Sequence, residues 1–375
     1  MNPQAQYGAD VIMRANYALE HGTEALSMCV RKAVNEMLGS LAEDAGIRRE
    51  DVFQVCVVGN TCMHHLFLGI SPASLVHAPY TPAVSERLVL NAGDYGLAVQ
   101  ERAELIMLSD IAGYVGADTC GCLLAIRQDQ QEEISLMIDI GTNGEMVLGN
   151  RERMVTCSTA AGPAFEGAKI ECGMRGAAGA VDHVKYEDGK WNYTTVGNKP
   201  AVGLCGSGLI DLVAGLLDAG MLDENGVLRS GQEKQGVFIL VPPERGGNER
   251  GVYLTQKDLG EVQLAKAAIA AGIQMLMERL GITEDDICSV YIAGAFGNYM
   301  DSVSAGKIGL LPAMLVKKVK PVGNAAGEGA KIALVNEKEM LEMDELVRKI
   351  EFVELAASAD FQDHFIDELG FETGE

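Results

Sequence analysis

Leu136-Met-Ile-Asp-Ile-Gly-Thr-Asn-Gly-Glu-Met-Val-Leu148 carries the strongest structural signal in this chain of 375 residues. Its apolar runs predict two strands, and the Gly, Thr and Asn residues between them predict a tight turn. Such a turn leaves backbone N–H groups and a hydroxyl free to bind a phosphate, and the residues predicted to do so are Gly141, Thr142, Asn143 and Gly144. Asp139, directly before the turn, can bind Mg²⁺ through water. The alternative is an ordinary hairpin in which Asp139 bonds to its own turn.

The chain contains one internal repeat. Gly46-Ile-Arg-Arg-Glu-Asp-Val-Phe-Gln-Val-Cys-Val-Val-Gly59 aligns without a gap with Gly281-Ile-Thr-Glu-Asp-Asp-Ile-Cys-Ser-Val-Tyr-Ile-Ala-Gly294. Each copy follows a helical pattern, so we predict a duplicated subdomain; residues 8–45 predict two helices that break near His21. No strand–turn–strand with an Asp precedes Gly46. We therefore expect the first lobe to be incomplete at its N-terminus, without a phosphate hairpin of its own.

Further glycine-rich turns follow predicted strands, at Thr159–Gly167, Gly203–Gly208, Ala293–Asn298 and Gly323–Gly329. Each can place backbone N–H groups at the start of a helix, where anions bind well. Taken singly, such a turn is more often a simple loop. Beside the Asp139 hairpin they predict a nucleotide site, to which we assign Gly162, Pro163, Gly206, Ser207, Gly208, Asn324 and Gly327.

The segment between the two copies predicts a short strand over Ala103–Leu108 and then a helix over Ile111–Ile126. Glycine inside a helix costs about 0.5–1 kcal/mol relative to alanine, so the glycines here indicate close contact with another helix or a ligand. Asp110 stands before this helix and either orients a water molecule or caps the helix. Residues 181–200 and 236–254 predict β-hairpin insertions, and helices are expected to flank a strand at Ile350–Leu355.

Composition excludes several classes of function. The formal net charge of −23 argues against nucleic acid or an anionic membrane as a partner, because both need a basic surface. No apolar run is long enough to span a bilayer and the polar start is no signal peptide, so we expect a cytoplasmic protein. The nine cysteines are scattered through apolar runs, as reduced thiols are in the cytosol.

No cluster of cysteine and histidine predicts a metal site. Cys120 and Cys122 are too close in sequence for the usual zinc spacing and are expected to pack in a helix. His64 and His65 are neighbours, which point in different directions on a helix or strand, so we expect them not to form a ligand cluster with Cys62.

Several of these motifs resemble the acetate and sugar kinase, heat-shock chaperone and actin superfamily. Asp139–Glu145 is similar to its second phosphate motif, and the helices from Asp110 and from Asn324 are similar to its two connecting helices. The residues that resemble its adenosine motif are Gly294, Ala295, Phe296 and Gly297. The resemblance implies a two-lobed, duplicated α/β fold of the ribonuclease H-like (actin-like ATPase) class. The first lobe would be residues 1–126 and the second residues 127–375, with C-terminal helices that return toward the junction.

A narrower resemblance covers residues 2–371. Val57-Val-Gly-Asn-Thr-Cys-Met-His-His65, Ala161-Gly-Pro-Ala-Phe-Glu-Gly167 and Ala293-Gly-Ala-Phe-Gly-Asn298 resemble the C-terminal ATPase region of reductive activators of corrinoid proteins. That family implies ATP and Mg²⁺ as cofactors and ATP-driven reduction of an inactive Co(II) corrinoid protein to Co(I). Asp139 would bind Mg²⁺, and Glu145 or Asp110 would orient the attacking water. Glu166 either faces the nucleotide or belongs to a structural turn.

The resemblance also implies partners. They are a corrinoid (iron–sulfur) protein or corrinoid methyltransferase subunit and a ferredoxin-like electron donor domain. A homodimer is a further option, because an incomplete first lobe would leave a sheet edge unpaired. Iron–sulfur clusters need four closely spaced thiolates, so we expect the cluster to lie outside this chain. Two alternatives remain open, a small-molecule kinase of the same superfamily and a non-catalytic nucleotide-sensing protein.

Overall fold

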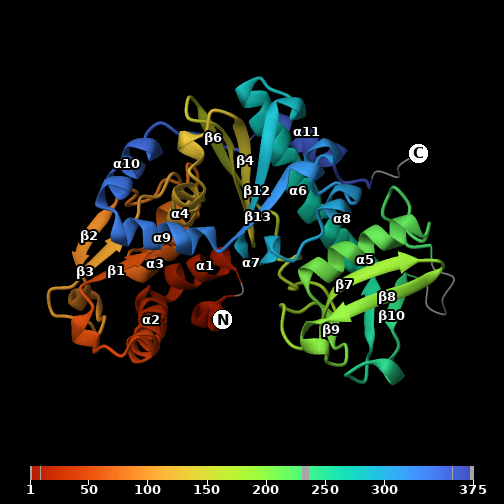
Figure 1. Ribbon diagram of the computed structural model, residues 1–375, viewed down its shortest axis with the longest axis horizontal. Helices are drawn as coiled ribbons and strands as arrows, with labels where there is room; N and C mark the ends of the chain where they lie inside the picture. Colours follow the sequence, from red (N-terminus) through yellow and green to blue (C-terminus); the bar gives the residue numbers. More distant parts are fainter. Residues whose placement is uncertain (1, 9, 230–235, 357, 372–375) are drawn as a thin grey trace. The chain divides into compact units, whose positions relative to one another are not determined.

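Two compact units make up the computed structural model shown in Figure 1, which describes residues 2–8, 10–229, 236–356 and 358–371. The first unit comprises Met1–Gln131, Arg151–Met154 and Asn324–Phe352, and the second comprises Glu132–Asn150, Val155–Gly323 and Val353–Glu375. Each unit is assembled from three separate segments of the chain, because the units are defined by contacts between residues. The division into lobes after residue 126 stays a prediction. No helix in the described residues is long and apolar enough to cross a membrane.

The second unit contains the predicted Asp139 hairpin, which is confirmed. β4 (Ile134–Ile140) and β5 (Gly144–Gly149) pair antiparallel, with Asp139 opposite Glu145. Within the second unit, they belong to a sheet whose strands follow the order β13-β12-β4-β5-β6. The other strands that this unit gives to the sheet are β6 (Met154–Thr159), β12 (Ile287–Ala293) and β13 (Val319–Gly323). Because β4, β12 and β13 are parallel, their carboxyl ends meet at one edge, where ligands bind in α/β sheets.

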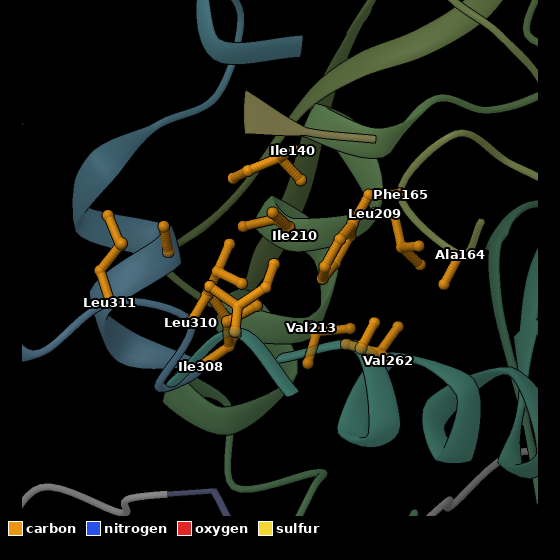
Figure 2. Packing of buried hydrophobic residues seen from close by; sticks show 14 of the residues in the cluster. Ile140, Ala164, Phe165, Leu209, Ile210, Val213, Val262, Ile308, Leu310 and Leu311 are labelled. Atoms are coloured by element: carbon orange, nitrogen blue, oxygen red, sulfur yellow. The ribbon is translucent and has the colours of Figure 1, made fainter. Parts of the chain in front are cut away.

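A long helix covers this sheet. α6 (Gln256–Leu280) packs against β5, where a Cβ on Gly272 would lie 2.3 Å from the methyl group of Met146. The remaining helices of the unit are α5 (Gly206–Asp218), α7 (Gly294–Gly297), α8 (Ser302–Lys307) and α11 (Ala359–Asp367). Figure 2 shows part of the core, where Ile140 at the end of β4 lies near Ile210 of α5, and Phe165 lies near Leu209.

Both predicted hairpin insertions are confirmed. β7 (Ala180–Glu187) and β8 (Lys190–Thr195) form one, and β10 (Val237–Val241) and β11 (Val252–Thr255) form the other. β9 (Gly203–Leu204) adds to the first by pairing parallel with β7, directly before α5. The prediction of a helix at the Thr159–Gly167 turn is wrong, because the chain forms further turns there and no helix begins.

A three-stranded sheet with the order β1-β3-β2 is the centre of the first unit. Its strands are β1 (Gln54–Val57), β2 (Leu88–Asn91) and β3 (Glu104–Met107), with β1 parallel to β3. The helices before it are α1 (Val11–His21) and α2 (Glu24–Ala45), which confirms the break predicted near His21. The others are α3 (Thr61–Leu68), α4 (Ala117–Ile126), α9 (Ala325–Val335) and α10 (Glu337–Val347); β14 (Glu351–Phe352) follows α10.

The one glycine of α4, Gly121, lies where that helix meets α9, which confirms the predicted close contact with another helix. Figure 1 shows the two helices side by side. A Cβ on Gly121 would stand 2.6 Å from the carbonyl oxygen of Ala326, and one on Gly329 only 1.9 Å from that of Gly121. α4 begins at Ala117 and not at Ile111 as predicted, because residues 112 and 115 form a short β-bridge instead.

The predicted repeat is confirmed by the structure within each unit. α2 ends at Gly46 and α6 ends at Gly281, and both glycines are left-handed caps. A 3₁₀ turn and a parallel strand follow in each case, β1 in the first unit and β12 in the second. β12 pairs with strands on both sides, whereas β1 pairs with β3 alone among the strands of the described residues. The first unit therefore repeats the core of the second without a β4–β5 counterpart in the described part.

Candidate functional site

The turn between β4 and β5 presents Asp139 at the carboxyl end of β4. The turn is closed by Gly141, whose N–H donates to the Asn143 carbonyl over 3.0 Å. Gly144 opens β5, and a Cβ there would stand 2.8 Å from the Thr159 hydroxyl, so close packing requires glycine. Burial, and then the negative charge of Glu166, raise the pKa of Asp139 to about 6. Asp139 is thus held where a cation would stabilise its charged form.

The turn that resembles an adenosine motif lies directly beside this carboxylate. Ala293, the last residue of β12, is the register partner of Asp139 in the parallel β4–β12 pair. Gly294 follows with a positive φ of 86°, and a Cβ there would lie 3.0 Å from Asp139 Oδ1. Two turns distant in the sequence therefore meet, because parallel strands end at the same edge of the sheet.

The Thr159–Gly167 loop joins the same edge. The Gly162 N–H donates to the Thr142 carbonyl over 2.9 Å, and the Thr142 hydroxyl donates to Glu166 Oε1 over 3.1 Å. Its Phe165 ring stacks on Phe296 of α7 with 5.8 Å between ring centroids. The loop is thus fixed both to the hairpin and to the adenosine-like turn.

The start of α5 completes this junction. A Cβ on Gly206 would lie 2.1 Å from the Phe165 carbonyl oxygen and 2.6 Å from the Phe296 ring, so only glycine fits between them. Ser207 and Gly208 have other neighbours. The Ser207 hydroxyl lies 3.4 Å from the Cys205 sulfur, and a Cβ on Gly208 would meet the Val181 carbonyl of β7 at 2.2 Å.

The structure therefore brings together most of the predicted site residues. They are Asp139, Gly141, Thr142, Asn143, Gly144, Gly162, Pro163, Gly206, Gly294, Ala295, Phe296 and Gly297. Glu145 lies opposite Asp139 on β5 and is 8% exposed. Phe165 was not predicted as a site residue, although an aromatic residue inside the glycine-rich Thr159–Gly167 turn was an available signal.

Three predicted site residues belong to the first unit. Asn324 caps α9, because its Oδ1 accepts a hydrogen bond from the Gly327 N–H at 3.1 Å. Asp110 is buried and accepts a hydrogen bond from the Ala117 N–H at 2.9 Å, at the first residue of α4. This hydrogen bond supports the interpretation that Asp110 caps α4, although the residue at the N-cap position itself is Gly116.

Asp110 also has a partner that sequence analysis missed. His64 Nδ1 lies 3.3 Å from Asp110 Oδ1, and both side chains are almost fully buried. His65 instead contacts the Thr61 carbonyl and accepts a hydrogen bond from the Ala83 N–H. The two histidines thus have separate partners, as expected for neighbours on a helix.

The donor set at the Asp139 turn suits magnesium. Asp139 and Glu166 supply carboxylate oxygens beside this turn, and Mg²⁺ prefers oxygen ligands. In the described residues, no group of three or more His, Cys, Asp or Glu side chains could hold a metal ion. A magnesium ion here would therefore need phosphate and water oxygens to complete six ligands.

Comparison with known proteins points to one family. The family model described as the C-terminal domain of RACo, the ASKHA domain, matches residues 133–375, and the RACo middle region matches residues 1–131. A protein of Eubacterium limosum named corrinoid activation enzyme RamQ is 35% identical in an alignment of 384 positions that covers 98% of this chain and 64% of that protein. A [Co(II) methylated amine-specific corrinoid protein] reductase of Methanosarcina barkeri is 27% identical over 98% of this chain and 71% of its own length.

A solved structure is similar throughout. It is named reductive activator for corrinoid, iron–sulfur protein, and it matches with a TM-score of 0.89 and 38% identity over 99% of this chain and 61% of its own. This chain thus spans less than two thirds of the length of that protein and of the Eubacterium limosum relative.

Proposed function

Because the chain belongs to the RACo family, whose ASKHA-domain and middle-region models together match nearly all of it, we propose that it is the ATP-binding part of a reductive activator of corrinoid proteins. The fold is that of the ASKHA superfamily, as the Asp139 hairpin and the repeat predicted. The activity proposed is ATP-dependent reduction of an inactive Co(II) corrinoid protein to Co(I). The electron would come from an iron–sulfur domain that is not part of this sequence.

One observation carries the nucleotide part of the proposal. Asp139 and Ala293 are register partners at the carboxyl ends of parallel strands, so the phosphate-type turn and the adenosine-type turn are adjacent. One nucleotide can contact both turns only if the distance between them does not exceed the length of the nucleotide. The loop containing Gly162 and the start of α5 at Gly206 contact the same two turns.

Each group at this edge has a proposed task. Bound Mg²⁺ would supply positive charge that neutralises the phosphates. Asp139 would hold it through water, while the N–H groups of the turn would donate to phosphate oxygens. The Thr142 hydroxyl would also donate to phosphate once it turns away from Glu166. Hydrolysis in such a site depends on positioning and electrostatics, and Glu145, opposite Asp139 on β5, would orient the water molecule.

Coupling of nucleotide to the corrinoid partner would follow from linkage. A ligand shifts a conformational equilibrium only by its different affinity for the two states. ATP and the corrinoid protein would therefore favour the same conformation of this chain. The partner is proposed to be a corrinoid (iron–sulfur) protein, because the relatives are named for corrinoid proteins. A corrinoid methyltransferase subunit is the alternative partner that the sequence resemblance implies.

The test measures ATP binding by calorimetry and corrinoid reduction by visible absorption. The chain is mixed with a Co(II) corrinoid protein, a ferredoxin-like donor and a reductant, with ATP and Mg²⁺ present or omitted. We expect Co(I) to accumulate only when the chain, ATP and Mg²⁺ are all present. Phosphoryl transfer to acetate or a sugar, without any effect on Co(II), would favour the kinase alternative and contradict the proposal.

A further inference from the structure

Glu166 is held against the phosphate-type turn by a fixed loop. Its own N–H donates to the Pro163 carbonyl over 3.1 Å, so it sits in a closed turn of the chain. That loop is anchored to the hairpin through the bond from the Gly162 N–H to the Thr142 carbonyl. The stacked Phe165 and Phe296 rings anchor its other side. The position of Glu166 is therefore set by three neighbouring segments.

The carboxylate of Glu166 faces the turn that Asp139 begins. Glu166 Oε1 accepts the Thr142 hydroxyl at 3.1 Å and lies 3.4 Å from where a Cβ on Gly141 would be. Two carboxylates of like charge at one turn repel each other, and a divalent cation between them removes that repulsion.

We propose that Glu166 is the second protein carboxylate of the magnesium site, acting with Asp139 on a Mg²⁺ ion carried by the nucleotide. The inference rests on the proposed nucleotide-binding function. Mg²⁺ takes one or two carboxylates together with substrate phosphates and water in most nucleotide sites. Because two carboxylates alone hold Mg²⁺ weakly, the ion binds here together with ATP, and Glu166 strengthens the binding of Mg·ATP over that of ATP alone.

A purely positioning role for Glu166 makes a different prediction. If Glu166 only fixed the Thr142 hydroxyl, removing its charge would weaken ATP binding equally with and without metal. If Glu166 binds the ion, removing its charge weakens ATP binding only when the metal is present. Metal-free ATP would then bind Glu166→Gln as well as wild type or better, because one negative charge near the phosphates is gone.

The experiment compares ATP affinity in Mg²⁺ with that in a chelator, by calorimetry on the full chain. The dissociation constant in chelator divided by that in Mg²⁺ is the magnesium enhancement ratio. We expect Glu166→Gln to lower this ratio at least about tenfold, with unchanged or tighter binding in chelator. Thr142→Val should instead weaken binding in both conditions and keep the ratio. The EPR spectrum of Mn²⁺·ATP on the protein gives an independent reading, since loss of a carboxylate ligand changes the zero-field splitting.

Glu187→Gln is the matched control, because Glu187 is an exposed carboxylate at the end of β7 in the same unit. It should leave the ratio and the EPR spectrum as in wild type. A Glu166→Gln ratio within twofold of wild type overturns the role of Glu166, provided that wild type shows the enhancement. Wild-type protein that binds ATP neither with nor without Mg²⁺ would overturn the proposed function itself and this inference with it.

Discussion

Asp139 is a carboxylate whose surroundings in the folded chain destabilise its charged form. Burial and the neighbouring Glu166 both disfavour its charged form. Structural ion pairs usually do the opposite, since a partner of opposite charge stabilises a carboxylate. Perturbation of this kind is common at functional sites, where a bound ligand supplies the missing charge.

Asp139→Asn keeps the shape of the side chain and removes its charge. We expect ATP affinity in the presence of Mg²⁺ to fall by more than about tenfold, because the hydrated metal loses the carboxylate that holds it. The melting temperature should stay constant or rise, since a disfavoured charge is removed. Asp188→Asn, in the exposed β7–β8 turn, is the control and should bind Mg·ATP like wild type. Undiminished binding by Asp139→Asn would make the hairpin structural.

The pH dependence of stability has a defined sign at the same residue. The pKa of Asp139 is raised from 3.8 to about 6 on folding, so the folded chain binds this proton more tightly than the unfolded chain. Its contribution to the free energy of unfolding is therefore full below pH 3.8 and is lost as the pH rises through about 6. The melting temperatures of wild type and Asp139→Asn are measured from pH 4 to 7. The melting temperature of the variant, relative to that of wild type, should increase as the pH rises. A constant difference would contradict the raised pKa.

At the scale of elements, the crossing of α4 and α9 shows why the glycines are there. The backbones approach so closely that Gly121 and Gly329 leave no room for a methyl group. Sequence analysis predicted the contact from the energetic cost of glycine in a helix. It did not predict where α4 begins, because the Thr61 hydroxyl donates to the Ala112 carbonyl at 2.7 Å and helps to hold that segment out of the helix.

Gly329→Ala tests this crossing. The added Cβ would meet a backbone carbonyl, which has no rotamer to change, so we expect a loss of about 1–3 kcal/mol in the free energy of unfolding. Gly260→Ala in α6 is the matched control, because no neighbour lies within 4 Å of its added Cβ. That change should stabilise the chain by roughly 0.5–1 kcal/mol. Urea unfolding measures both, and equal effects would show that close packing is not the reason for Gly329.

At the scale of the whole molecule, the net charge of −23 bears on how a nucleotide is held. Such a field opposes a polyphosphate, so binding depends on local donors and on magnesium. The same field argues against nucleic acid and an anionic membrane surface as partners.

Linkage makes a quantitative prediction for the whole chain. If Mg·ATP tightens binding of the corrinoid protein by some factor, the corrinoid protein must tighten binding of Mg·ATP by the same factor. We expect a factor of about 5–150, the usual range of such coupling. Calorimetric titrations of each ligand, with the other absent or saturating, give the two factors. Independent binding, with a factor of one in both directions, would contradict coupling through this chain.

The sequence by itself determined most of the elements and their repeat, because local patterns are sufficient for them. The alternation of apolar runs and turn residues around Asp139 predicted the hairpin, and the alignment of Gly46–Gly59 with Gly281–Gly294 predicted the duplicated core. The motifs also indicated the family that the comparisons show.

Only the tertiary structure decided which glycine-rich turns meet. Sequence spacing treats Gly206, Ser207 and Gly208 alike, yet Gly206 alone fits between Phe165 and Phe296, while Gly208 packs on β7. Glu166 reaches the Thr142 hydroxyl through a loop whose course no periodicity describes. The pairing of His64 with Asp110 was equally hidden. The physical reason is that these contacts join residues far apart in the chain, and their geometry depends on strand register and backbone packing, which no local pattern encodes.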